Sequence, residues 1–183
     1  MDSTLAYNAV ACLVENRLRP GPFPGLPEAF RPQNLVQAYD LQDALCTALT
    51  EAGLGRKVGH KIGCTSRIMQ EYMDIPHPCS GNIFQNNVFQ ISMDKPAASY
   101  HHIGVECEIA VKILEDIPDR KASYTATSVS RHIKSCMAAI EIVDDRYNNF
   151  RELDIETIVA DDFFQAACVL GQEIFEWEKL DFS

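Results

Sequence analysis

The sequence predicts an α+β protein in which two helices come first and a β-rich part follows. Apolar residues recur at helical spacing over residues 4–18 and 34–52. From residue 58 onward, short runs rich in β-branched residues alternate with glycine and proline turns, which is typical of strands. The pattern changes where Gly53 and Gly55 end the second helix. We therefore divide the chain into an N-terminal helical cap, residues 1–54, and a β-rich domain, residues 55–183.

Composition excludes several classes of protein. A length of 183 residues suits one domain with a small appendage, and a net charge of −10 argues against a nucleic-acid partner. No apolar run is long enough to span a membrane and no signal peptide is visible, so we expect a cytoplasmic protein without a membrane partner. The seven cysteines form no Cys-x-x-Cys pair, which predicts free thiols in a reduced protein and no zinc site.

Local patterns of apolar and turn-forming residues predict the helices, strands and loops in chain order. In the first half these are a helix over 4–18, a proline- and glycine-rich connector over 19–27, a helix over 34–52, a strand over 58–66, a short helix over 66–73, a loop over 76–81, and strands over 82–84 and 88–92. In the second half they are a strand over 105–113, a helix over 128–136, a strand over 137–146, a helical turn over 154–159, a polar turn over 160–162 and a strand over 163–171.

The strand over 105–113 carries two carboxylates at alternate positions. Glu106 and Glu108 point to the same face, with Cα atoms roughly 6.5 Å apart at the usual strand rise. Their neighbours are apolar, so a hard divalent cation such as Mg²⁺ or Mn²⁺ would explain why two like charges share a face. The alternative is the solvated outer face of an edge strand, and a single Glu-x-Glu pattern leaves both interpretations open.

A third carboxylate, Glu141, lies inside another apolar strand. An isolated glutamate in such surroundings is costly to bury unless it is paired or bound to a cation. Glu141 could complete a cage of three carboxylates with Glu106 and Glu108, or it could form a salt bridge with Arg146 or Lys134.

Lys61 lies in the expected strand over 58–66, between Gly59 and Gly63. Glycines let a neighbouring backbone or a ligand approach closely. A lysine at such a place either extends to solvent or enters a site, where it could carry a proton.

These motifs occur in an order that resembles the fumarylacetoacetate hydrolase superfamily, and most closely its 2-keto-4-pentenoate hydratase and 4-oxalocrotonate decarboxylase branch. The resemblance covers nearly the whole chain. It is carried by Gly59–Ser66, Val105–Ala110, Ala139–Asp144, Val159–Phe163 and Leu170–Gly171.

The resemblance implies a β-rich roll that carries the site at its mouth, with Mg²⁺ or Mn²⁺ held by carboxylates. The family's metal ligands correspond to Glu106, Glu108 and Glu141. Its lysine corresponds to Lys61 and its Ala-Asp turn to Asp161, which makes these two the expected catalytic residues. We also expect Ser80 and Ile62 to contact the substrate.

The implied activity is that of a metal-dependent lyase acting on a small 2-oxo acid. A metal-stabilised enolate would lead to hydration or decarboxylation, and hydrolysis of a carbon–carbon bond is also open. The partners expected are the small 2-oxo acid and further copies of the chain in a homo-oligomer.

The chain departs from the family pattern at two points, the first of which indicates a substrate or reaction different from that of the hydratases. The hydratases usually carry an acidic residue where this chain has Cys79 and Ser80, and their domain continues with several more strands after Leu170–Gly171. We therefore expect a roll that lacks its last strands, in a domain incomplete at its C-terminus. The missing strands favour an alternative function, a catalytically inactive truncated homologue or an assembly subunit that keeps the fold, whereas the presence of Lys61 and of all three carboxylates argues against it.

Overall fold

The computed structural model describes residues 2–19, 21–119 and 123–181, and it has the expected α+β architecture. The helices are α1 (Ser3–Leu18), α2 (Leu35–Leu49), α3 (Arg67–Met73), α4 (Ala126–Ser130) and α5 (Ile155–Ala160). A π-helical turn, Thr50–Leu54, extends α2, and Gly53 adopts a φ of 100° there. That positive φ suits glycine and ends the helix where the sequence predicts.

The strands form two sheets. In the smaller sheet, β1 (Lys57–Gly63) and β2 (Cys79–Phe84) pair antiparallel. The larger sheet has the order β3-β6-β5-β4, where the strands are β3 (Val88–Gln90), β6 (Gln165–Leu170), β5 (Ile133–Asp144) and β4 (Ile103–Ile113). β3 runs parallel to β6, and the other pairs are antiparallel. β4 is therefore an edge strand along its whole length.

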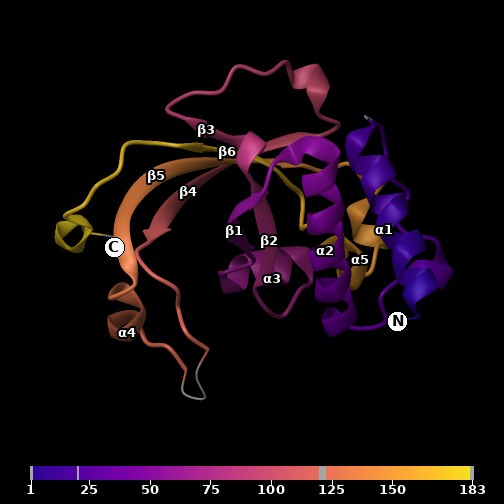
Figure 1. Ribbon diagram of the computed structural model, residues 1–183, viewed down its shortest axis with the longest axis horizontal. Coiled ribbons are helices and arrows are strands. Elements are labelled where there is room, and N and C mark those ends of the chain that lie inside the picture. Colours follow the sequence, from indigo (N-terminus) through magenta and orange to yellow (C-terminus); the bar gives the residue numbers. More distant parts are fainter. Residues whose placement is uncertain (1, 20, 120–122, 182–183) are drawn as a thin grey trace.

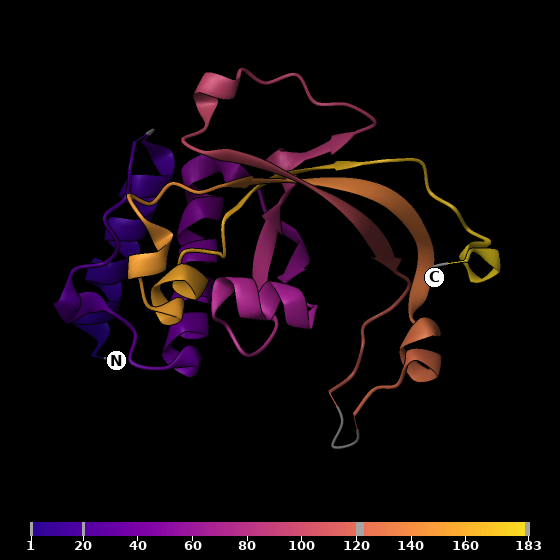
Figure 2. The same ribbon diagram turned by 180° about the vertical axis from the view of Figure 1, so that it is seen from behind.

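The helices α1, α2 and α5 lie side by side at one end of the molecule, as Figures 1 and 2 both show. Side chains cap the N-termini of α1 and α2. The Asp2 carboxylate accepts a hydrogen bond from the Thr4 N–H, and the Asn34 side chain accepts one from the Gln37 N–H. The buried core joins α2 to the β-rich part, because Leu41, Leu45 and Leu49 belong to the same cluster as Phe84 and Val159. The division between residues 54 and 55 stays a prediction.

The helix predicted over 128–136 is wrong for its second half. Helix α4 ends at Ser130 and β5 begins at Ile133. Ser135 lies opposite Lys112, and Cys136 lies opposite Val111 on β4. The ladder with β4 therefore outweighs the local helical pattern.

The strand predicted over 163–171 begins two residues later, because three successive residues before it are left-handed. Asp162, Phe163 and Phe164 have φ values of 63°, 46° and 62°. Residues other than glycine rarely adopt this left-handed backbone conformation, and the resulting strain is tolerated where the surrounding packing enforces it. We call these three residues the DFF turn.

Strand β4, which lies along β5 in Figure 2, is exposed on both of its faces over most of its length. On one face it carries exposed apolar residues, namely Ile103, Val105, Cys107, Ile109, Val111 and Ile113. On the other face it carries Glu106 and Glu108. Among the described residues, no helix combines the length and apolar character needed to cross a bilayer.

Candidate metal and active site

The register of β4 and β5 brings three carboxylates to one face of the sheet. Glu106 lies directly opposite Glu141, and Glu108 lies one pair further along the same face, opposite Ala139. Oxygen atoms of Glu106, Glu108 and Glu141 all lie within 4.8 Å of one another. We call these three residues the carboxylate cluster. It is the group of potential metal ligands found among the described residues.

The donor set of the cluster fits a hard divalent cation. Mg²⁺ takes oxygen ligands at about 2.1 Å, so an inward movement of the three side chains would close the cluster around an ion. Glu141 is buried, and the Lys61 ammonium, 2.8 Å away, is the one cation that its Oε1 atom contacts among the described residues. Three carboxylate groups, without thiol or imidazole donors, favour Mg²⁺ or Mn²⁺ over zinc or copper.

Lys61 of β1 reaches the cluster from the smaller sheet. Its Nζ atom lies 2.8 Å from Glu141 Oε1, and both side chains are about nine-tenths buried. Burial raises the pKa of the Glu141 carboxyl, while the Lys61 ammonium lowers it and the two other carboxylates raise it further. Neither Arg146 nor Lys134 takes the role of salt-bridge partner that the sequence left open, because Glu141 pairs with Lys61.

Phe163, Gly63 and Gly81 pack closely around the side chain of Lys61, and we call this arrangement the cradle. The Lys61 Nζ atom lies 5.2 Å from the centre of the Phe163 ring, within cation–π range. The ring in turn packs on Gly63, where a Cβ atom would come within 2.5 Å of Phe163 Cε1. The lysine stem passes over Gly81, its cross-strand neighbour, where a Cβ would lie 3.1 Å from Lys61 Cγ. Both glycines are therefore needed for this close packing.

Asp162 also packs on Gly81, through its backbone carbonyl oxygen, and is almost fully buried, with 1% of its surface exposed. Its Oδ1 atom accepts the Asn82 N–H at 2.6 Å, whereas its Oδ2 atom is buried without a hydrogen-bond partner. Burial raises the pKa of Asp162 to about 6, against the opposing field of Arg17 and Lys61 and the hydrogen bond from Asn82. A carboxyl with an unpartnered buried oxygen is unusual in a folded protein.

Asp161 has a different environment from its neighbour. Its carboxylate accepts hydrogen bonds from Arg17, from Arg146 and from the Tyr147 hydroxyl, the last at 2.8 Å. The Arg17 Nε atom lies 3.1 Å from Asp161 Oδ1. Burial raises the pKa of the Tyr147 hydroxyl far above its ordinary value, with a further contribution from Asp161. The contacts of Asp161 thus join it to two arginines and a tyrosine rather than to the carboxylate cluster.

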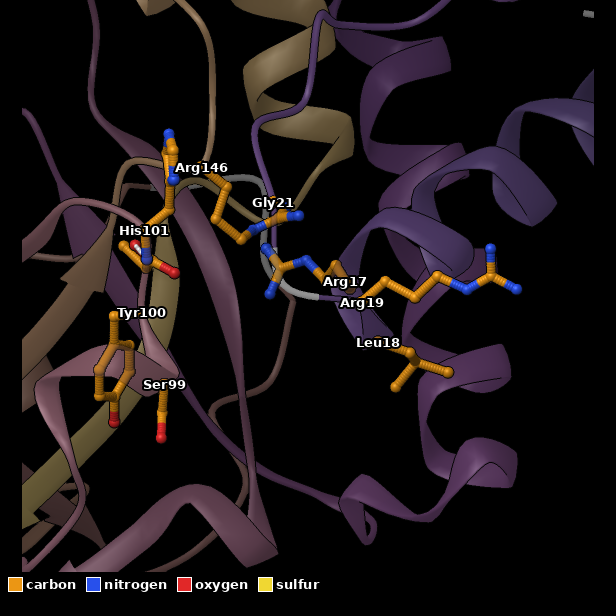
Figure 3. Close-up of a pocket in the computed structure, with 9 residues that line it drawn as sticks. Arg17, Leu18, Arg19, Gly21, Ser99, Tyr100, His101 and Arg146 are labelled. Carbon is orange, nitrogen blue, oxygen red and sulfur yellow. Dashed lines mark hydrogen bonds between the residues drawn. The ribbon is translucent and has the colours of Figure 1, made fainter.

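Figure 3 shows that Arg17 and Arg146 bring their guanidinium groups close to each other, with Arg19 turned away. They line a cavity of about 440 Å³ between the end of α1 and the start of β4. None of the residues that the sequence nominated for the site lines this cavity. Asp161 neutralises part of the charge of the two arginines from behind.

Ile62 and Ser80 face each other across β1 and β2. Because side chains alternate along a strand, they point away from the face that carries Lys61. Ile62 is 61% exposed, and the backbone of Ser80 binds the Tyr39 hydroxyl and the Gln42 amide. The structure therefore does not bring their side chains together with Lys61, and their contact with a substrate stays a prediction.

Curated relatives of the chain are hydratases. It is 32% identical over 150 residues to a 2-keto-4-pentenoate hydratase of Paraburkholderia phymatum, which covers 80% of this chain and 54% of that protein. It is 28% identical over 163 residues to a 2-keto-4-pentenoate hydratase of Paraburkholderia xenovorans, covering 88% of this chain and 59% of that protein. The chain thus spans a little over half the length of these relatives. A search of family models gave no match.

The fold matches a solved decarboxylase. The structure of 4-oxalocrotonate decarboxylase from Pseudomonas putida G7, complexed with calcium and acetate, superposes with a TM-score of 0.83 at 19% identity, over 97% of this chain and 66% of that one. The same enzyme complexed with magnesium and adipate gives a TM-score of 0.80 at 20% identity, over 94% and 65% of the two chains. At this identity the likeness establishes the fold.

In sequence and in fold, the chain is thus similar to the 2-keto-4-pentenoate hydratases and to 4-oxalocrotonate decarboxylase, the group that its motifs resemble.

Two residues beside Lys61 were not nominated from the sequence. Asp162 was part of a polar turn and Phe163 the start of a strand, and no spacing rule indicates that either one flanks the lysine. Only the left-handed DFF turn directs them there. The adjacent aspartates were the one available signal, because two neighbouring carboxylates in apolar sequence each need a partner.

Proposed function

We propose that this chain forms the metal-binding part of an enzyme that acts on small 2-oxo acids as a hydratase or decarboxylase. One observation carries the proposal: the carboxylate cluster on β4 and β5 lies in contact with a buried lysine from the other sheet, at 2.8 Å from Glu141. The hydratase and decarboxylase names of the relatives support the substrate class.

The cluster residues Glu106, Glu108 and Glu141 would hold Mg²⁺ or Mn²⁺. When bound, the cation supplies Lewis-acid stabilisation of negative charge on the oxygen of a 2-oxo group. Lys61 would move a proton at the carbon beside that group, and the position of its ammonium at the cluster supports this role. Phe163 shields the ammonium from solvent and fixes its direction.

Asp161 has a supporting role in this proposal. Its bonds to Arg17 and Arg146 fix the start of the DFF turn, which in turn places Phe163 on Lys61. Ser80 and Ile62 remain proposed substrate contacts, and assembly into a homo-oligomer remains part of the proposal.

The test is turnover of a panel of 2-oxo acids with Mg²⁺ or Mn²⁺, together with direct measurement of metal affinity by calorimetry. We expect Lys61→Met to reduce turnover by at least about a hundredfold, the usual range for losing a general acid or base, with metal affinity no weaker than that of the wild type. Glu108→Gln should lose metal binding and turnover together. Equal turnover by Lys61→Met and wild type would remove the lysine from the mechanism.

A non-catalytic homologue or assembly subunit is the second candidate. The apolar face of β4 favours it, since Val105 and Ile109 are 63% and 58% exposed and suit an interface. Metal binding at the cluster without turnover of any 2-oxo acid in the panel would support this candidate over the enzyme.

A further inference from the structure

Lys61 and a metal ion compete for the same carboxylate. In the structure the ammonium lies 2.8 Å from Glu141 Oε1. A divalent cation in the carboxylate cluster needs the oxygens of Glu141 as well, and two cations this close repel each other. The Lys61 side chain is only 7% exposed, so the ammonium would need another partner inside the protein.

Asp162 offers such a partner within reach of the lysine. Lys61 and the Asp162 backbone both pack on Gly81, where a Cβ would lie 3.1 Å from Lys61 Cγ and 2.9 Å from the Asp162 carbonyl oxygen. The Asp162 carboxyl is anchored at the next residue of β2, through its bond to the Asn82 N–H. The two side chains are close enough for Lys61 to lower the pKa of Asp162, and the four rotatable bonds of the lysine stem let its ammonium move while the strand stays in place.

The second oxygen of Asp162 is available. Oδ2 is buried and has no hydrogen-bond partner. The charged groups that act on this carboxyl are Arg17, Asp161 and Lys61, and Arg17 already donates to Asp161 and to the Gln165 carbonyl oxygen. Asp162 Oδ2 is thus a fixed acceptor without a hydrogen-bond partner, and it lies near Lys61. The present partner of Lys61, Glu141, is a candidate metal ligand. Together these observations indicate a second position for the Lys61 ammonium.

We propose that Asp162 is the second partner of Lys61: the ammonium pairs with Glu141 when the carboxylate cluster holds no metal, and with Asp162 Oδ2 when a divalent cation binds the cluster. The inference rests on the metal site of the proposed function. Asp162 is then a positioning residue, which acts through Lys61. It strengthens metal binding by drawing the competing ammonium away from Glu141, and it fixes where the lysine lies in the metal-bound protein.

The test is a double-mutant cycle on Mn²⁺ affinity, measured by calorimetry on the full chain at pH 8, where Asp162 is ionised. The proteins are wild type, Asp162→Asn, Lys61→Met and the double variant. We expect Asp162→Asn to weaken Mn²⁺ binding about tenfold, because the ammonium then stays on Glu141. In the Lys61→Met background the same change should alter the affinity less than twofold, since no ammonium is left to relocate.

A loss of affinity by the same factor in both backgrounds would overturn the inference, because Asp162 would then act on the metal through its own charge. Unchanged affinity in Asp162→Asn would overturn it as well. Glu108→Gln identifies the site: if wild type binds no Mn²⁺, or if Glu108→Gln binds it equally well, the proposed metal site fails and the inference fails with it. If the cluster binds Mn²⁺ but the effects of Asp162→Asn and Lys61→Met on the affinity are additive, the inference fails and the proposed metal site stands.

A second measurement does not depend on whether Asp162→Asn folds. The amide N–H of Asn82 donates to Asp162, so its NMR chemical shift reports a new partner on that carboxyl. Titration with Mg²⁺ should move this signal in the wild type and leave it in place in Lys61→Met. An identical movement in both proteins would contradict the relocation of Lys61.

Discussion

Asp161 and Asp162 are neighbours in the chain and are both almost fully buried, yet their surroundings are opposite. Asp161 is paired with two arginines and a tyrosine, whereas Asp162 keeps one oxygen without a partner. A buried carboxylate is tolerated when its charge is compensated and is costly when it is not. The two residues should therefore respond in opposite directions to the loss of their charge.

For Asp161 the expected effect is destabilisation. Asp161→Asn removes the carboxylate that pairs directly with the buried Arg17 and Arg146, which should lower the free energy of unfolding by about 3–5 kcal/mol. Urea denaturation followed by circular dichroism measures this change. Glu15→Gln is the matched control, because the exposed pair of Glu15 with Arg19 should be worth less than about 1 kcal/mol. Similar effects of the two changes would show that the arginine pair does not depend on Asp161.

For Asp162 the expected effect is stabilisation that depends on pH. Its pKa rises from 3.8 to about 6 in the folded protein, so the folded state binds the proton more tightly than the unfolded state. Stability contributed by this group is thus greatest below pH 3.8, falls as the pH rises toward 6, and stays low above that. At about 1.4 kcal/mol per pKa unit, Asp162→Asn should stabilise the protein by roughly 3 kcal/mol at pH 8 and by only about 0.5 kcal/mol at pH 4. Unfolding curves of both proteins at the two pH values test this, and a gain independent of pH would contradict it.

At the scale of single elements, the strands were predicted better than their ends. The strand that carries Glu106 and Glu108 and the strand that carries Glu141 were both expected, and their pairing needs only an ordinary antiparallel ladder. The sequence could not show that β5 begins at Ile133 or that the DFF turn precedes β6, because both follow from tertiary packing. For the same reason, the sequence predicted the carboxylate cluster but not the cradle around Lys61, because residues distant in the sequence form that cradle.

The element β1 allows a matched test of that cradle. Gly63→Ala would place a methyl group 2.5 Å from Phe163 Cε1, whereas at Gly59 the nearest atom to a new Cβ is Ile83 Cδ1 at 3.8 Å. We expect Gly63→Ala to lower the free energy of unfolding by about 1–3 kcal/mol, as in other overpacked sites, and to displace the ring from Lys61. Gly59→Ala should change it by less than about 0.5 kcal/mol. Equal effects in thermal or urea unfolding would show that the close packing of Phe163 on Gly63 is not needed.

At the scale of the whole molecule, the helical end is well covered and the far half of the large sheet is not. The core unites α2, α5 and the smaller sheet, while β4 exposes apolar residues on one face and carboxylates on the other. The chain spans only about two thirds of the decarboxylase chain that shares its fold. The sequence resemblance predicted the fold class correctly, whereas the two-sided exposure of β4 among the described residues was not predicted.

The edge position of β4 has a consequence for the exchange of its backbone hydrogens with heavy water. In an antiparallel pair only alternate residues of an edge strand bond to the neighbour, and the others direct their N–H groups outward. Between Val105 and Val111, alternate amides of β4 should thus exchange fast and slowly in turn, whereas residues 139–142 of β5, flanked by β4 and β6, should all exchange slowly. Exchange followed by NMR at each residue tests this. Uniformly slow exchange along β4 would mean that a further strand, from another molecule, continues the sheet in solution.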